Sequence, residues 1–277
     1  MAKGIGLIGN FRGKVGNMVG YNLKDSNNKQ TQGVRVYQPI VKNPKTAAQA
    51  EQRAKLLAVN ATYRALKMVI DRGNESLPYG NKSRLAWLKS ALKSEQMPWF
   101  EKGTSAKMPV GCLLSKGSLA GVYYEIIEDG IQISMQSATS STGVATVGAL
   151  STAFKADYPS LKDGDQITLV QVGNLHNQME STVISFVIDT TSTEAISGFT
   201  AGTGNITFDG GLVGGTGAVI VSRLGDNGEH LRSTSTLLIE SAVLADAPYD
   251  ADSKAAAIAS YRASAAASGD WAEESIQ

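Results

Sequence analysis

Residues 218–240, AVIVSRLGDNGEHLRSTSTLLIE, contain two apolar stretches on either side of a turn sequence. The stretches 218–223 and 232–240 are rich in valine, isoleucine, leucine and threonine, most of which favour strands. The GDNGE between them has the glycine, asparagine and aspartate that tight turns need. This pattern predicts two consecutive strands of an antiparallel sheet.

The same pattern of short apolar stretches and turn sequences recurs in residues 121–208. Turn sequences such as EDG, KDGD and DTTSTE separate the stretches. Further strands are predicted at residues 121–127, 131–136, 166–173, 182–188 and 205–208, with one helix at 147–156. Short strands at this spacing are typical of an antiparallel β-sandwich, and we expect an Ig-like one.

The first 110 residues have a different pattern. Residues 14–24 and 33–38 predict a β-hairpin in which Val34 and Val36 share one face and Arg35 and Tyr37 the other. Thr46 with Gln49 predicts the capped start of a helix over 47–70. A second helix over 82–94 carries leucines at i, i+3 and i+7, namely Leu85, Leu88 and Leu92.

These patterns predict an α+β protein in three parts. Residues 1–110 form a basic arm, hairpin and helical region, and residues 111–250 form the antiparallel β-sandwich domain. Residues 109–121, PVGCLLSKGSLAG, are interpreted as a loop or linker between them. Residues 251–277 form an alanine-rich helical tail that ends in an acidic segment.

Charge is divided unevenly along the chain. Residues 1–110 hold 19 lysines and arginines and 6 acidic residues, a net charge of +13, whereas residues 111–277 have a net charge of −12. A basic part joined to an acidic one indicates either nucleic-acid binding or contact between neighbouring copies. A third interpretation is that the two parts neutralise each other within one molecule.

The basic part begins with a glycine-rich segment, residues 9–21, GNFRGKVGNMVGY. Glycine permits close approach of a partner backbone, and we assign that role to Gly13, Gly16 and Gly20. The residues expected to bind nucleic acid or another subunit are Arg12, Lys14, Lys24, Arg35, Lys82, Lys89 and Lys93. On a helix face, lysines are also compatible with an ordinary solvated surface.

The sequence contains no convincing pattern for an enzyme. The glycines at 9 and 13 do not have Walker A spacing, and Val15 stands where a P-loop needs a hydroxyl. His176 and His230 lack the cysteine or carboxylate spacing of a zinc site, and Asp163 and Asp165 indicate a turn. We therefore expect no catalytic residue, metal, cofactor or small-molecule substrate. The single cysteine, Cys112, is predicted to be buried and structural.

We expect no targeting signal either. The apolar stretch within the first ten residues is too short for a signal peptide. No other stretch approaches the ~18 apolar residues of a membrane helix. We expect a protein of the cytoplasm or of a virion, without a membrane partner.

Two segments resemble an uncharacterised protein family of Bacteroidota and their phages. The first matches a G-x-F-x-G-K-V-G-x-V-V-G-like motif at Gly9, Phe11, Gly13, Lys14, Val15, Gly16, Val19 and Gly20. The second matches an N-P-x-T-x-x-Q-x-x-x-R helix start at Asn43, Pro44, Thr46, Gln49 and Arg53. Residues 218–239 also look like the closing strands of that family. The resemblance implies a phage structural gene and no chemistry.

Three functions follow as hypotheses. The first is a non-enzymatic, virion-associated phage protein whose basic half contacts DNA, other copies of itself or other virion proteins. The second is a host-surface adhesin in which the β-domain recognises the ligand. The third is a hydrolase acting through a site that the sequence does not reveal.

Overall fold

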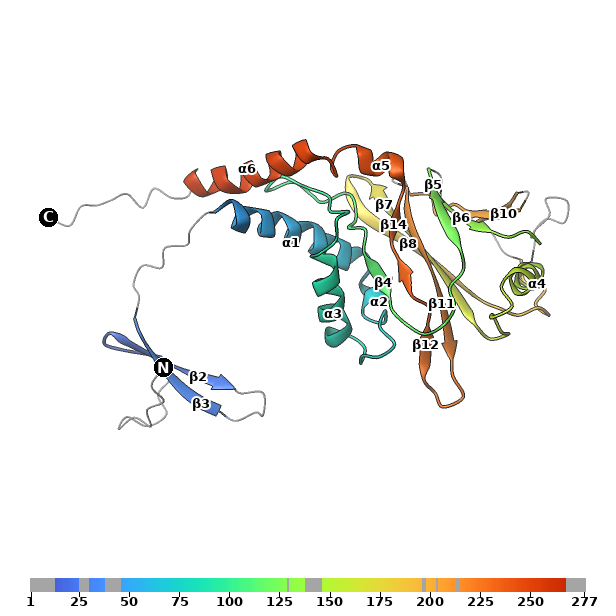
Figure 1. Cartoon of the computed structure of the whole chain (residues 1–277), viewed down its shortest axis with the longest axis horizontal. Helices are drawn as coiled ribbons and strands as arrows, with labels where there is room; N and C mark the ends of the chain where they lie inside the picture. Colours follow the sequence, from blue (N-terminus) through green and yellow to red (C-terminus); the bar gives the residue numbers. More distant parts are fainter. Residues whose placement is uncertain are drawn as a thin grey trace. The chain divides into compact units, whose positions relative to one another are not determined.

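The computed structural model describes residues 13–24, 30–37, 46–128, 130–137, 146–195, 198–202, 204–212 and 215–267. The chain divides into two compact units, residues 1–44 and 45–277. The boundary therefore follows the hairpin, whereas the sequence predicted one near residue 110. Figure 1 colours the elements along the chain.

The first unit contains an antiparallel sheet in the order β1-β2-β3, here called the N-terminal sheet. Its strands are β1 (Gly13–Val15), β2 (Met18–Lys24) and β3 (Gln30–Val36). The predicted hairpin is confirmed as β2 and β3, and Met18 pairs with Val36 at one end of it. The short strand β1 adds to the free edge of β2.

The second unit begins with helices. They are α1 (Ala47–Ala65), α2 (Lys67–Ile70) and α3 (Asn81–Ala91). Thr46 caps α1 as predicted, because its hydroxyl accepts a hydrogen bond from the Gln49 backbone N–H at 3.3 Å. The helix expected over 47–70 is interrupted at Leu66, whose ψ of 19° separates α1 from α2.

The helices pack on an antiparallel sheet, here called the central sheet. It has the order β12-β11-β7-β8, with β14 also paired to β11. Its strands are β7 (Gln166–Leu175), β8 (Gln178–Val187), β11 (Thr216–Leu224), β12 (His230–Arg232) and β14 (Leu238–Ile239). His176 and Asn177 join β7 to β8 with φ values of +50° and +62°, as a type I′ turn requires.

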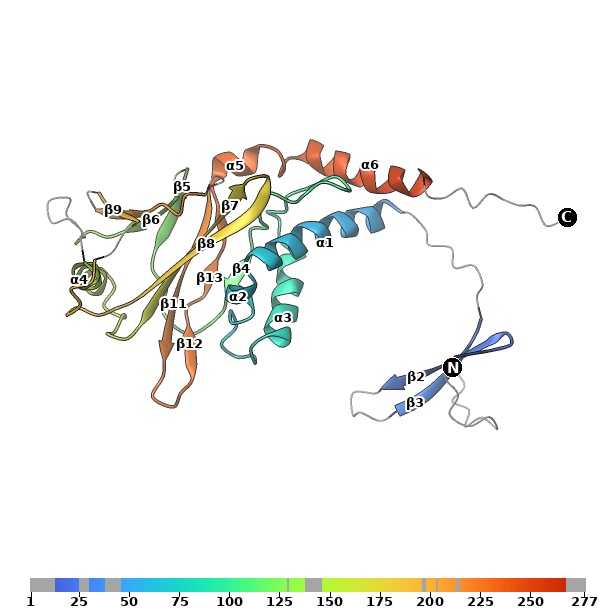
Figure 2. The ribbon, with the colours of Figure 1, turned by 180° about the vertical axis from the view of Figure 1, so that it is seen from behind.

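A further antiparallel sheet, the outer sheet, has the order β5-β6-β10-β9. Its strands are β5 (Tyr124–Ile127), β6 (Gly130–Ser134), β9 (Phe199–Ala201) and β10 (Asn205–Phe208). The helix α4 (Val147–Asp157) packs beside it, and Thr146 caps this helix by accepting from the Ala149 N–H at 3.3 Å. Figures 1 and 2 show α4 on the side of the unit away from α1.

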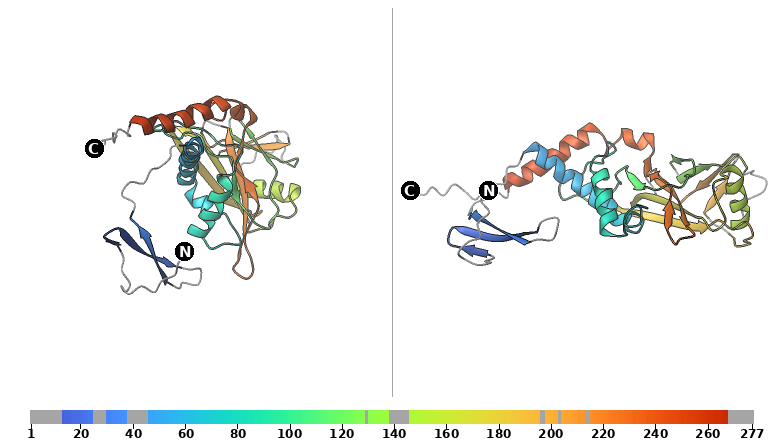
Figure 3. Two further views of the ribbon diagram at one scale, coloured as in Figure 1. Left: turned by 60° about the vertical axis from the view of Figure 1, so that its left-hand side comes forward. Right: turned by 60° about the horizontal axis from the view of Figure 1, so that its bottom comes forward.

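The two middle strands of the central sheet, β7 and β11, are buried on both faces. In β7, Ile167 and Leu169 belong to a core shared with the outer sheet, whereas Val170 and Val172 belong to a core shared with the helices. The strand β11 divides its residues in the same way. This explains why β11 is a continuous apolar stretch instead of an alternating one. The helices, the central sheet and the outer sheet therefore form three layers, visible in Figure 3.

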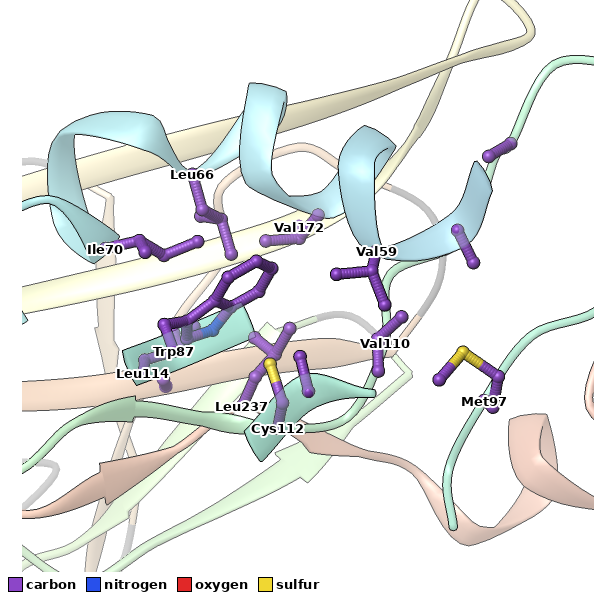
Figure 4. Close-up of a cluster of buried hydrophobic side chains, with 14 of the residues drawn as sticks. Val59, Leu66, Ile70, Trp87, Met97, Val110, Cys112, Leu114, Val172 and Leu237 are labelled. Carbon is purple, nitrogen blue, oxygen red and sulfur yellow. The ribbon is translucent and has the colours of Figure 1, made fainter. Parts of the chain in front are cut away.

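The segment expected as a linker is part of the core. Val110, Cys112 and Leu114 are buried, and Figure 4 shows them beside residues of α1, α3 and β7. Strand β4 (Leu113–Ser115) pairs with β13 (Ser235–Thr236). The interpretation of 109–121 as a linker is wrong for its first part, because Val110, Cys112 and Leu114 fill space between helices and sheet, whereas residues 116–121 are a loop, as predicted.

The C-terminal helices also belong to the second unit. They are α5 (Ser241–Ala245) and α6 (Ala251–Ala267). The helix α6 lies alongside α1, as Figures 1 and 2 show, and its Ala257 is fully buried in the helical core. The predicted helix is confirmed, and its described part is packed onto the unit.

Candidate nucleic-acid and subunit interface

One face of the N-terminal sheet carries cations. Lys14 pairs with Val19 across β1 and β2, and Val19 pairs with Arg35 across β2 and β3. Because directly paired residues project to the same side of a sheet, Lys14 and Arg35 share a face. Both are exposed. The Lys14 ammonium lies 3.6 Å from the centroid of the Tyr37 ring, a cation–π contact on that face.

A second aromatic ring lies on the same face. Tyr21 pairs with Gly33, and a Cβ added to Gly33 would lie 2.7 Å from Cζ of Tyr21. The phenol ring therefore covers the space that glycine leaves open. Two tyrosine rings and two cations on one small sheet are the side-chain types that hold stacked bases and phosphates. We call Lys14, Tyr21, Arg35 and Tyr37 the cation–aromatic face.

The opposite face of the N-terminal sheet is apolar and exposed. Met18, Val34 and Val36 are 43%, 53% and 75% exposed, respectively. Met18 and Val36 are a cross-strand pair, so these side chains adjoin. We call these three residues the apolar face. Exposed apolar side chains gathered on one face are typical of protein contact surfaces.

The glycines of this sheet have backbone roles that the structure shows. Gly16 is the first residue of the two-residue turn between β1 and β2 and has a φ of +56°, the geometry of a type II′ turn. A Cβ on Gly13 or Gly16 would have no atom of the described chain within 4 Å. Gly20 is buried and pairs with Gly13 and Val34. Close approach of a partner backbone to these glycines stays a prediction.

The helical lysines form a separate group. Lys82, Lys89 and Lys93 are all exposed, and within the described residues none of them forms an ion pair. Leu85 lies on their side of α3 and is 48% exposed, although the spacing of the leucines predicted a face separate from the lysines. Trp87 and Ala91 form the buried side of the helix instead.

The predicted binding residues are thus found in two groups. Lys14 and Arg35 are together on the N-terminal sheet, where Lys24 ends β2 opposite Gln30. The lysines of α3 belong to the other unit. Arg12 lies outside the described residues. Tyr21 and Gly33 also belong to this sheet surface and were not predicted as members of it, although their cross-strand pairing follows from the hairpin.

Within the described part of the second unit, the basic side chains of α1 to α3 lack close acidic partners from positions beyond 110. Leaving Lys102 aside, no lysine or arginine of residues 46–110 is within ion-pair distance of an acidic residue of the described part of 111–277. Lys254 of α6 does pair with Glu51 of α1 at 3.4 Å, but here the cation belongs to the acidic part and the carboxylate to the basic part. Close pairing across position 110 within this unit therefore does not neutralise the cations of α1 to α3.

Two residues considered for catalysis have structural roles. Cys112 is buried, and burial raises the pKa of its thiol to about 12. A thiol that stays protonated at neutral pH is a poor nucleophile. Asp165 ends the predicted turn and is buried, where both of its carboxylate oxygens bind Arg223.

The two histidines are far apart in the fold. His176 is exposed at the tip of the β7–β8 hairpin, as expected of a surface loop. His230 is also exposed but lies in β12, where its ring packs against Tyr79 at a centroid distance of 5.6 Å. In the described ranges, no group of three or more histidine, cysteine or acidic side chains is placed to hold a metal ion.

A helix that crosses a bilayer must be both long and apolar. No helix in the part of the chain that the structure describes combines the length and the apolar character required.

Comparison of the chain with protein-family models, with curated proteins and with solved structures finds no match in any of the three.

Proposed function

We propose that this chain is a non-enzymatic structural protein whose N-terminal sheet binds nucleic acid through its cation–aromatic face. The observation that carries the proposal is the placement of Lys14, Arg35, Tyr21 and Tyr37 on one side of a sheet of three short strands. The cations neutralise phosphates, and the rings offer surfaces on which bases stack.

The apolar face supports contact with a second protein at the same time. Met18, Val34 and Val36 project from the side opposite Lys14 and Arg35, so one face does not block the other. We propose that a neighbouring copy of this chain, or another protein of the same particle, covers them. The sheet then acts as an arm between nucleic acid on one face and protein on the other.

The particle is proposed to be a phage virion. This rests on the resemblance of residues 9–20 and 43–53 to the Bacteroidota phage family, and on the net charge of +13 over residues 1–110. The location is accordingly proposed as virion or cytoplasm. For the fold, two antiparallel sheets that share one apolar core support an Ig-like sandwich, which stays a proposal.

Fluorescence anisotropy of labelled single- and double-stranded DNA tests the proposal. The full chain is compared with the double variant Lys14→Gln/Arg35→Gln over a series of salt concentrations. If both cations contact phosphates, the slope of log K against log[salt] becomes shallower by roughly 1.4–1.8 in the variant.

The matched control is Lys116→Gln/Lys162→Gln, which removes two exposed lysines outside the proposed surface. It is expected to leave affinity and slope nearly unchanged. Equal losses in both double variants mean a non-specific charge effect. Absence of binding by the wild-type chain at low salt refutes nucleic-acid contact and leaves contact between subunits.

A further inference from the structure

A concave pocket of about 390 Å³ lies in the second unit. It is formed where residues 71–80, which connect α2 to α3, meet the β11–β12 hairpin. Arg72 and Tyr79 contribute from the connection, and Arg223, His230 and Arg232 from the hairpin. We call it the arginine pocket. Its volume falls within the range of small-molecule sites.

The pocket has an excess of positive charge. None of its ten described lining residues is acidic. Arg223 is held by Asp165, so its charge is largely compensated. The Arg72 side chain makes no ion pair or hydrogen bond within the described chain. One uncompensated guanidinium therefore stands at the wall of the cavity.

Arg232 also has a hydrogen-bond donor without a partner among the described residues. Its Nε is buried and has no hydrogen-bond partner among the described residues. The nearby Glu75 carboxylate accepts instead from the Arg232 backbone N–H, the Ser118 N–H and the Ser118 hydroxyl, at 2.9, 2.9 and 2.8 Å. Buried polar groups normally find partners, so the unpartnered Nε leaves Arg232, a residue that lines the cavity, with an unused hydrogen-bond donor.

We propose that the arginine pocket binds the phosphoryl group of a small phosphate ester. Donors reach the cavity from two separate elements, and a tetrahedral phosphate accepts hydrogen bonds from several directions, whereas a carboxylate accepts in one plane. The packed rings of Tyr79 and His230, together with Leu224, offer apolar surface for the organic part of the ester. The site goes beyond the nucleic-acid proposal, since it needs no residue of the N-terminal sheet.

Calorimetric titration of the full chain tests this site. The probes are phenyl phosphate, inorganic phosphate and phenylmalonate, which carries two carboxylates. Phenyl phosphate is expected to bind best, inorganic phosphate more weakly and phenylmalonate least. Arg72→Gln is expected to weaken phenyl phosphate roughly ten-fold by removing a charged donor.

Arg53→Gln is the matched control, because Arg53 is an exposed arginine of α1 outside the pocket. It should leave the affinity unchanged. A second variant, Arg232→Lys, keeps the charge but removes the planar fork and should also weaken binding.

Three results overturn the proposal. The first is no heat of binding for phenyl phosphate at millimolar concentration. The second is equal binding by the wild-type chain and by folded Arg72→Gln, with folding checked by thermal melting. The third is phenylmalonate binding as well as phenyl phosphate, which means a general anion site. None of these results depends on whether the chain binds DNA.

Discussion

Arg223 holds Asp165 with two hydrogen bonds, from Nε to Oδ1 at 2.6 Å and from Nη2 to Oδ2 at 2.7 Å. The residues are 58 positions apart, and the Asp165 side chain is only 1% exposed. The same carboxylate accepts from the Lys162 backbone N–H at 2.8 Å. The ion pair therefore joins the turn before β7 to the C-terminal end of β11.

Removing this buried carboxylate should destabilise the second unit. In Asp165→Asn the amide cannot satisfy Arg223 and the Lys162 N–H together, so we expect a loss of about 2–3 kcal/mol. The exposed pair of Lys155 and Asp163, at 2.7 Å, offers a matched comparison, and Lys155→Gln should cost less than about 1 kcal/mol. Urea unfolding measures both, and equal losses contradict the role assigned to Asp165.

Acid should weaken the chain partly through Glu75. Burial acts to raise the pKa of this carboxyl, but hydrogen bonds from the Arg232 N–H and from Ser118 outweigh it and lower the pKa from its ordinary value of 4.5. Ionised Glu75 therefore stabilises the fold above that value, and the stabilisation is lost as the pH falls through the lowered pKa. Urea midpoints between pH 6 and pH 3 should fall less steeply in Glu75→Gln than in the wild-type chain.

Glu95→Gln is the control for this pH series, because Glu95 is exposed outside this contact. Its acid dependence should match that of the wild-type chain. A Glu75→Gln curve parallel to the wild-type curve would show that Glu75 does not contribute to acid sensitivity.

The apolar face of the N-terminal sheet should govern self-association, if a second copy covers it. The double variant Val34→Thr/Val36→Thr keeps β-branched side chains but adds hydroxyls to the contact. We expect concentration-dependent association in the wild-type chain, and a markedly higher dissociation constant in the variant. Sedimentation velocity measures this.

The corresponding control is Val183→Thr, an exposed valine of β8 in the second unit. It should associate as the wild-type chain does. A wild-type chain that stays monomeric at high concentration refutes the second copy and leaves another protein as the occupant.

Cys112 should be unreactive until the chain unfolds. Burial removes the thiol from solvent, and its pKa of about 12 keeps it protonated near neutral pH. A disulfide reagent is expected to label one thiol rapidly in denaturant and to label the native chain only at the rate of opening. Fast labelling of the native chain would place Cys112 at an accessible site and contradict its position in the core.

Local sequence determined the type of most elements. Periodicity and turn residues were sufficient for the hairpin β2–β3 and for strand β10, which spans the predicted residues 205–208. The helix start at Thr46 was also predicted, because a capping hydroxyl acts on an N–H only three residues away. The sequence also predicted that Val34 and Arg35 project to opposite faces of the sheet, because successive side chains alternate within a strand.

Tertiary structure decided where segments find their partners. Residues 232–240 were predicted as one strand, but the chain pairs Arg232 with β11, leaves to pair Ser235 with β4, and returns to pair Ile239 with β11. Which partner is available at each step depends on residues more than 100 positions away, such as Ser115. No local pattern carries that information.

The candidate sites show the same division. The sequence determined that the N-terminal part is basic and that Arg35 and Tyr37 share a face. Only folding placed Lys14 over Tyr37, joined Asp165 to Arg223, and gathered Arg72 and Arg232 around one cavity. The physical reason is that strand and helix periods act over a few residues, whereas these contacts depend on which layers of the core pack together.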